Sequence, residues 1–406
     1  MVYQSPAGAR DLLPLEVAQK GWIEERLQQV FYRWGYHRII TSTLERLDTL
    51  MAGGAIDRSS VLQLQDLQDE DLGLRPELTA SIARAAATRL VGAAHPLRLC
   101  YTANVFRRAK ENDHTRQQEF HQAGVELLGT GGLLADVEAM LLLLDCLKNL
   151  GLSQGSIVLG EAGLTRSLLA AFPLAVRDKV RRAIAHLDRI TLESLPAPLR
   201  EQALLLLDLR GNPADVLQRV AHLKLDAYQH RSLNNLKSLV DLLQSHFSTS
   251  SCLILDLSLI RTFDYYTGIV FEVISTGDDS GQQVLAQGGR YDQLLGLYHP
   301  QGQSVPGIGF SFEIEQLHRA LLTTGQLPQK TRSSDRLVVP ENPQAYTAAL
   351  SYAQTLRDED DRARVELDLG GRTPAEIQDY ARHRRIPQIA WVKPDGEAVI
   401  ETLNPQ

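Results

Sequence analysis

The sequence contains little cysteine and no long apolar segment. Cys100, Cys146 and Cys252 lie far apart, so they form neither a disulfide framework nor a metal-ligand spacing, and a reducing cytoplasm is expected. The longest apolar run, 139–144, is bracketed by acidic residues and is far too short to cross a bilayer. The first residues lack the basic-then-apolar pattern of a secretion signal. We therefore expect a cytoplasmic protein without a membrane span.

Positive charge is also scarce. The net charge is −7 and the pI is about 5.9. Proteins that bind nucleic acid normally carry a basic stripe or domain, because binding depends mostly on neutralising phosphates. Residues 331–406 hold ten basic and thirteen acidic side chains, a net charge of −3, and their one basic cluster, 382–385, can equally be a solvated helix face. This balance argues against a tRNA-binding tail.

The chain has 406 residues, of which 44% are hydrophobic and 22% charged, so two or three globular domains are expected. Apolar periodicity predicts helices at 15–35, 136–150, 345–357 and 374–384, and helices throughout 160–251. Strand patterns occur at 38–44, 97–106, 120–128, 252–257, 268–274, 336–340, 365–369 and 388–392. Residues 305–320 pass from strand into helix, and 323–334 is a polar linker that precedes a small α/β unit.

Two segments carry side chains suited to a small polar ligand. Glu77 and Thr79 place a carboxylate and a hydroxyl around a proline turn, a good receptor for an ammonium group, although an ordinary loop ion pair would also explain them. Along the second strand of the predicted hairpin, alternation puts Phe120, Gln122 and Glu126 on one face. That row suits a ligand held over a sheet, and the alternative is a strand facing solvent.

Two further segments combine aromatic, basic and glycine residues. Residues 261–268 join Arg261 to Tyr265 and Tyr266, whose hydroxyls and rings suit an imidazole. Adjacent tyrosines on a strand point to opposite faces, so only one is expected to face the ligand, and a tyrosine packed on a loop is the alternative. Residues 286–293 contain Gly288 and Gly289, which allow a close backbone approach to a ligand or form a plain turn.

Taken together, the order of these segments resembles that of the histidyl-tRNA synthetases, together with residues 8–14 (GARDLLP), 306–309 (PGIG) and 365–372 (VELDLGGR). The resemblance covers nearly the whole chain. It implies an α+β fold of the class II aminoacyl-tRNA synthetase type, with an antiparallel sheet flanked by helices, a helical insertion and a small C-terminal α/β domain. The expected core spans 1–159 and 252–322, the insertion 160–251, and the linker with a reduced anticodon-binding domain 323–406.

The same resemblance assigns a histidine pocket. Its amino-group receptors would be Glu77, Thr79 and Gln122. Its imidazole partners would be Glu126 and Tyr266, with Tyr265 beside them, and its carboxylate partners Arg116 and Arg261. All of these positions match the family pattern. One neighbour departs from it, since Leu78 replaces a usual glycine and is expected to narrow the pocket.

The nucleotide half of the resemblance is incomplete. Arg107 and the adenine-stacking Phe120 are present, but Ala109 replaces a glutamate, Gln316 the last motif's arginine, and Glu313 a glycine. Fixed cations supply much of the rate of adenylate formation, and losing one such contact costs about 3 kcal/mol in the transition state. Glu313 is expected to add a negative charge near the phosphates. The site is therefore predicted to be vestigial, and we predict no catalytic residue, metal or cofactor.

A histidine-pocket fold without the nucleotide cation resembles a family of synthetase paralogues, the regulatory subunits of ATP phosphoribosyltransferase. This resemblance implies a non-enzymatic partner of the short-form catalytic subunit, needed for its activity in the first step of histidine biosynthesis, that participates in feedback by histidine. It also implies a homodimer within a hetero-oligomer that binds no tRNA. Two alternatives stay open at this point: an active histidyl-tRNA synthetase and a stand-alone histidine-binding paralogue.

Overall fold

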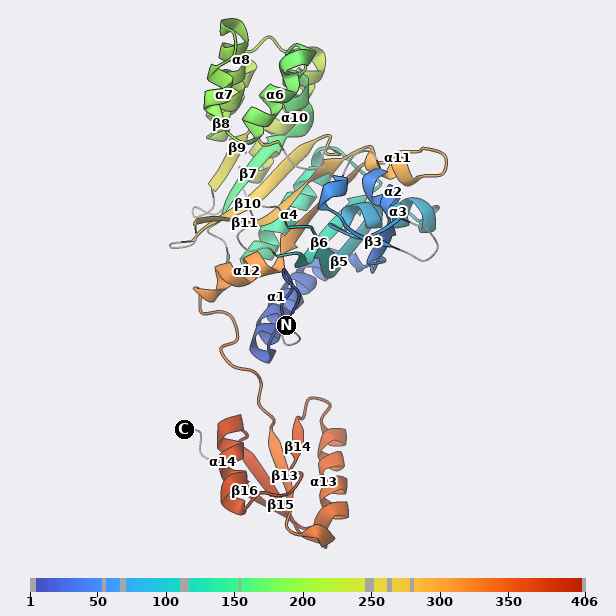
Figure 1. Ribbon diagram of the computed structural model, residues 1–406, viewed down its shortest axis with the longest axis vertical. Helices are drawn as coiled ribbons and strands as arrows, with labels where there is room; N and C mark the ends of the chain where they lie inside the picture. Colours follow the sequence, from blue (N-terminus) through green and yellow to red (C-terminus); the bar gives the residue numbers. More distant parts are fainter. Residues whose placement is uncertain are drawn as a thin grey trace. The chain divides into compact units, whose positions relative to one another are not determined.

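The structure, a computed structural model, describes residues 5–52, 56–65, 71–109, 117–152, 155–244, 252–260, 265–277 and 281–403. The chain forms two compact units, Met1–Pro328 and Gln329–Gln406 (Figure 1). Among the described residues, no helix combines the length and apolar character that a membrane crossing needs. The assignment of core, insertion and reduced anticodon-binding domain stays a prediction.

The larger unit is built on a sheet whose nine described strands run in the order β1-β5-β6-β12-β11-β10-β7-β9-β8. Their bounds are β1 (His37–Arg38), β5 (Leu97–Phe106), β6 (Glu119–Leu128), β7 (Ser156–Glu161), β8 (Arg210–Gly211), β9 (Cys252–Asp256), β10 (Ile269–Gly277), β11 (Gly281–Tyr291) and β12 (Gly307–Glu313). The six consecutive strands from β5 to β7 are antiparallel, as predicted. The pairs β1–β5 and β7–β9 are parallel, so the sheet as a whole is mixed.

One face of the central strands carries the main core. It is covered by α1 (Pro14–Arg33), α4 (Leu133–Asn149) and α12 (Ile314–Leu322). In α1 the apolar residues Ile23, Leu27 and Val30 recur at helical spacing, and all three are fully buried in the same cluster as Val125 of β6. This packing explains why the predicted helix at 15–35 forms at 14–33.

The other face of β5 packs against a smaller assembly. It consists of β2 (Leu44–Arg46), α2 (Leu47–Met51), a 3-10 turn (Arg58–Ser60), β3 (Leu62–Gln65), β4 (Asp71–Leu74), α3 (Thr79–Arg89) and α11 (Leu294–Tyr298). Strand alternation sends Cys100 into the main core and Leu99 and Tyr101 towards Ile82 of α3. The predicted strand at 38–44 is wrong in its extent, because its two ends join different sheets as β1 and β2.

Between β7 and β9 the described chain forms helices joined by short turns, together with the two-residue strand β8. The helices are α5 (Ala162–Leu169), α6 (Leu174–Ala185), α7 (Arg189–Glu193), α8 (Ala197–Leu207), α9 (Pro213–Ala221) and α10 (Ala227–Gln244). Asp188 and Asn212 cap α7 and α9 by accepting hydrogen bonds from backbone N–H groups of the first turn. Strand β8, which the helical pattern hid, pairs with β9 at the sheet edge.

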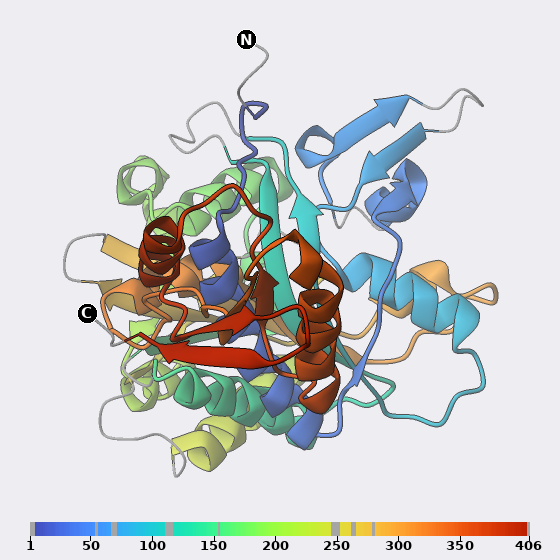
Figure 2. The same ribbon diagram turned by 90° about the horizontal axis from the view of Figure 1, so that it is seen from below.

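The smaller unit is a four-stranded sheet between two helices, in the order β14-β13-β15-β16. Its elements are β13 (Arg336–Pro340), a 3-10 turn (Pro343–Ala345), α13 (Tyr346–Glu359), β14 (Val365–Leu367), α14 (Pro374–Arg384), β15 (Gln388–Val392) and β16 (Ala398–Thr402). Leu337 faces α14 and Val338 faces α13, so the helices cover opposite faces (Figure 2). Strand β16 was missed, although the turn at 394–396 (PDG) signals a hairpin.

Candidate functional site

The described residues of the predicted histidine pocket come together over the central strands. Glu77 and Thr79 come from the start of α3, Gln122 from β6, and the two tyrosines from the turn before β10. The cavity between them is lined by Glu77, Thr79, Tyr101, Arg107, Gln122, Tyr265, Tyr266, Gln287, Tyr291, Gly309, Phe310 and Ser311. Arg116 and Arg261 lie outside the described residues.

Glu77 is anchored by the first turn of α3. Its carboxylate accepts hydrogen bonds from the backbone N–H of Thr79 at 2.6 Å and of Ala80 at 2.8 Å. These are N–H groups that a helix start leaves without intrahelical partners. Burial raises the pKa of Glu77, whereas these hydrogen bonds and the charge of Arg107 oppose the rise. The carboxylate is thus fixed beside the cavity by the backbone.

Glu126 is the second carboxylate of the site and is 1% exposed. It accepts a hydrogen bond from the Thr79 hydroxyl at 2.7 Å and another from the Tyr291 hydroxyl. Burial raises the pKa of Glu126 to about 8, and the nearby charge of Glu77 adds to the rise. Glu126 therefore holds a proton at neutral pH, which relieves repulsion between the two carboxyl groups.

Glycine at position 309 is what allows Glu126 to sit against β12. A Cβ atom built on Gly309 would lie 2.0 Å from Glu126 Oε2 and 2.4 Å from the carbonyl oxygen of Val125. Both distances are far below van der Waals contact, so any larger residue would displace the carboxyl group or separate β12 from β6. The glycine of the 306–309 segment is thus a positioning element of this cavity.

Both Tyr265 and Tyr266 line the cavity, so the expectation that only one faces it is wrong. They lie in a turn before β10, where the alternation of a strand does not apply. The two rings are 4.7 Å apart between centroids, and Tyr265 meets Tyr291 edge-on at 5.7 Å. These spacings are typical of stabilising aromatic pairs. Three tyrosines therefore form one wall of the site.

Gly288 and Gly289 lie inside β11, which excludes the plain turn and corrects the description of this segment as a turn. A Cβ on Gly289 would lie 2.7 Å from the Tyr266 ring, and one on Gly288 would lie 2.4 Å from the carbonyl oxygen of Gly309. The glycines therefore let the tyrosine wall and β12 approach β11 closely.

The cavity is small. It encloses about 20 Å³, roughly the space of one water molecule. Leu78 does not line it, because this side chain is buried in the cluster that contains Ile82 and Tyr101. The narrowing predicted from Leu78 therefore has another source, namely the side chains that converge from α3, β6 and the tyrosine turn. An amino acid can enter only if these side chains move apart.

Arg107, the arginine expected at the phosphates, is engaged by the protein itself. Its Nη1 lies 2.7 Å from Glu313 Oε1, and its Nε donates to the carbonyl oxygen of Pro76 at 2.9 Å. The guanidinium also lies 5.3 Å from the centroid of the Phe120 ring. Glu313 thus neutralises the cation in addition to introducing the negative charge expected from the sequence. Gln316, half-buried on α12, does not line the cavity.

Sequence reasoning missed several contributors to the site. Tyr101 and Tyr291 line the cavity, and Tyr291 also hydrogen-bonds Glu126. Tyr291 lies in the 286–293 segment that the sequence analysis singled out, whereas nothing in the local pattern marks Tyr101 as a site residue. The pairing of Arg107 with Glu313 joins positions 206 apart. Among the described residues, no group of three or more His, Cys, Asp or Glu side chains could hold a metal ion.

Comparison with known proteins gives this arrangement its context. The sequence profile of the histidyl-tRNA synthetase family matches residues 8–317. Among solved structures, an ATP phosphoribosyltransferase regulatory subunit/histidyl-tRNA synthetase from Bacillus halodurans superposes with a TM-score of 0.80 at 29% identity, covering 97% of this chain and 99% of the other. A histidyl-tRNA synthetase from Nostoc sp. PCC 7120 superposes with a TM-score of 0.76, covering 98% and 97%, and at 20% identity it shows the fold alone.

Curated relatives are more similar. A protein of Trichormus variabilis, described as an ATP phosphoribosyltransferase regulatory subunit, is 64% identical over 406 residues, the full length of both chains. A protein of Nostoc punctiforme with the same description is 62% identical over 405 residues, covering 99% of this chain and all of the other. The chain therefore belongs to the histidyl-tRNA synthetase family and, within it, to the regulatory subunits of the ATP phosphoribosyltransferase of histidine biosynthesis.

Proposed function

We propose that this regulatory subunit assembles with a short-form ATP phosphoribosyltransferase catalytic subunit, is required for its activity, and takes part in feedback by binding histidine. Two buried carboxyl groups carry the proposal: Glu77, which lines the tyrosine-lined cavity, and Glu126, which accepts hydrogen bonds from Thr79 and Tyr291 of that lining. A ligand that brings an ammonium group and an imidazole would supply the cation and the planar polar group that these side chains suit. By the family resemblance, Arg116 and Arg261, which lie outside the described residues, are proposed as the partners of the ligand carboxylate.

The pairing of Arg107 with Glu313 supports a role without aminoacylation. A nucleotide phosphate would have to displace a carboxylate at 2.7 Å that is itself half-buried. Gln316 brings no charge to replace the lost cation. Adenylate formation needs fixed positive charge at the reacting phosphorus, and this chain neutralises or omits it. Arg107, Phe120 and Gln316 are thus proposed to be remnants of a nucleotide site.

The small volume of the cavity suggests how histidine would act. Free chain and bound chain must differ in the arrangement of α3, β6 and the tyrosine turn, because about 20 Å³ cannot hold an amino acid. A ligand shifts an equilibrium only by its difference in affinity for the two forms. Histidine would therefore alter the catalytic subunit if the closed and opened forms bind that subunit with different affinity.

The remaining assignments follow from this proposal. The core at 1–159 and 252–322 would hold the site, and 160–251 would be the insertion. Residues 323–406 would be the linker and a reduced anticodon-binding domain that binds no tRNA, consistent with the net charge of −3 over residues 331–406. The chain would act in the cytoplasm as a homodimer within the hetero-oligomer.

The test combines the chain with the short-form catalytic subunit and measures phosphoribosyl transfer with and without histidine. We expect transfer only in the mixture and a change in rate with histidine. Glu126→Gln should weaken histidine binding by calorimetry and leave co-purification with the catalytic subunit unchanged. A mixture no faster than the catalytic subunit alone overturns the activating role, and the absence of any binding heat with the wild-type chain overturns the sensing role. Histidine-dependent ATP–pyrophosphate exchange at a synthetase-like rate would favour the ligase alternative.

A further inference from the structure

A second and much larger cavity lies between α1, the N-terminal segment 8–12 and the β5–β6 hairpin. It measures about 550 Å³, within the range of small-molecule sites. None of the described residues assigned to histidine lines it. Phe120 and His121 line this cavity, whereas Gln122 lines the smaller, tyrosine-lined cavity, and no described residue lines both. The two cavities are therefore separate.

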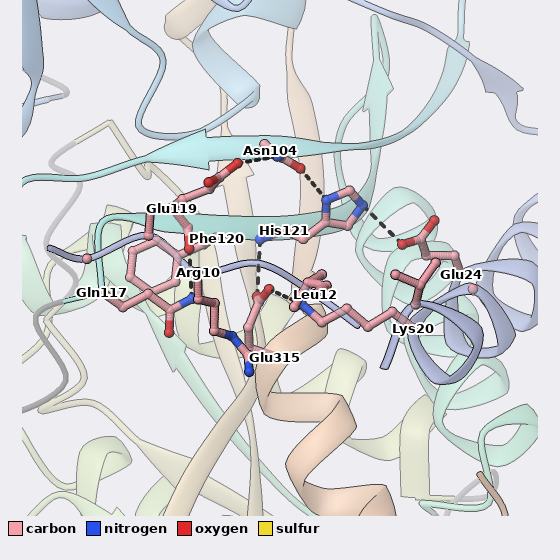
Figure 3. A pocket seen from close by; sticks show the side chains of 14 residues that line it. Arg10, Leu12, Lys20, Glu24, Asn104, Gln117, Glu119, Phe120, His121 and Glu315 are labelled. Carbon is pink, nitrogen blue, oxygen red and sulfur yellow. Dashed lines mark hydrogen bonds and ion pairs between the residues drawn. The ribbon is translucent and has the colours of Figure 1, made fainter. Parts of the chain in front are cut away.

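One wall is a chain of hydrogen-bonded side chains (Figure 3). The Asn104 amide nitrogen donates to Glu119 Oε1 at 2.5 Å, which turns the amide oxygen towards His121 Nδ1. His121 Nε2 faces Glu24 Oε1 at 3.2 Å, so the ring lies between Asn104 and Glu24. The Asn104 amide and the His121 ring are thus oriented by hydrogen bonds, and the wall presents preorganised polar groups.

The basic groups of the cavity are already matched by carboxylates. Lys20 Nζ lies 2.6 Å from Glu315 Oε1, and both side chains are more than nine-tenths buried. Glu315 Oε2 also accepts the backbone N–H of His121 at 3.1 Å. Arg10 Nη1 lies 2.8 Å from Glu16 Oε1. An anionic ligand would have to compete with these carboxylates for each cation.

Glu119 differs from the other charged groups. Its side chain receives a hydrogen bond from a neutral amide, and within the described part of the chain no cationic side chain pairs with it. Leu12, Val17 and Phe120 add apolar surface to the same cavity. A carboxylate with no countercharge beside apolar walls favours a cation that carries an apolar body.

We propose that this cavity binds a small organic cation, a protonated primary amine on an apolar or aromatic body, with its ammonium group on Glu119. The body lies along Leu12, Val17 and Phe120. Binding in this larger cavity does not depend on the smaller, tyrosine-lined cavity or on the proposed response to histidine.

The experiment titrates the full chain with benzylamine and follows binding by calorimetry, with benzyl alcohol and benzoate as neutral and anionic probes of the same shape. A ligand of this size is expected to bind with a dissociation constant of about 10 mM or tighter. Both other probes and the Glu119→Gln variant should bind at least about tenfold more weakly, because the charge-assisted contact is lost. Glu201→Gln, an exposed change on α8, and Glu126→Gln should bind benzylamine like the wild type.

A second variant blocks the cavity without removing a polar group. Gly21 lines the cavity, and a Cβ added there meets nothing within 4 Å. Gly21→Leu also places a better helix former within α1, so the variant should fold and should lose benzylamine binding. Benzylamine binding that persists in both the Glu119→Gln and Gly21→Leu variants would overturn the proposal. So would equal binding of benzoate, no detectable binding, or a loss caused by Glu126→Gln.

Discussion

Replacing Glu126 by glutamine should change how the stability of the larger unit depends on pH. The pKa of Glu126 is about 8 in the folded chain against 4.5 as the reference, so between these values the folded chain holds a proton that the unfolded chain has released. Raising the pH therefore removes stability. While Glu126 stays protonated only in the folded chain, the free energy of unfolding falls by about 1.4 kcal/mol per pH unit. The fall becomes smaller near pH 8, where Glu126 itself titrates. Between pH 6 and pH 8 the wild type should therefore lose about 2 kcal/mol of stability relative to Glu126→Gln.

The measurement is urea unfolding at pH 6, 7 and 8, followed by tryptophan fluorescence. Trp22 and Trp34 belong to the larger unit and Trp391 to the smaller one, so both proteins carry Trp391→Phe and the signal reports the larger unit alone. Any constant cost of the substitution cancels, because only the difference in slope is compared. Glu201→Gln serves as the matched control and should follow wild type. Parallel wild-type and Glu126→Gln stabilities across this range would refute the assignment of a buried, protonated carboxyl group.

Three further predictions concern the same unit. Glu313→Gly combined with Gln316→Arg should release Arg107 from its ion pair and strengthen ATP binding at least about tenfold by calorimetry. An unchanged affinity for ATP would count against the idea that Glu313 keeps Arg107 from binding a nucleotide. Lys20→Met should cost about 3–5 kcal/mol in urea unfolding because it leaves Glu315 buried and unpaired, and a second change of Glu315 to leucine should recover most of this. Gly309→Ala should lower stability and abolish histidine binding, while an alanine variant that binds histidine like wild type would contradict the close contact seen there.

Local sequence pattern was enough for many elements. Strands β13 and β15 and helix α14 occur at their predicted bounds, because each has an apolar periodicity with clear start and stop residues. The capping box formed by Thr373 and Glu376 is one such start signal. The class II synthetase-like fold was also confirmed, since the order of the motifs along the chain is itself a sequence property.

Other features depend on contacts between distant segments. Lys20 meets Glu315 across 295 positions, and the 550 Å³ cavity exists only because α1 and the N-terminal segment pack against the hairpin. Strand β11 was hidden because its glycines suggested a turn, whereas their function is close approach to β12 and the tyrosines. Local pattern contains no information about these approaches.

The sequence by itself determined which side chains are available: two carboxyl groups and two tyrosines for a ligand, and too few cations for the nucleotide. The tertiary structure decided the protonation of these side chains, the space between them and their ion pairs. Burial places a proton on Glu126, convergence of α3, β6 and the tyrosine turn reduces the cavity to about 20 Å³, and Glu313 neutralises Arg107. The physical reason is that desolvation, cavity volume and ion pairing depend on which distant segments pack together, and residue identity alone does not specify that packing.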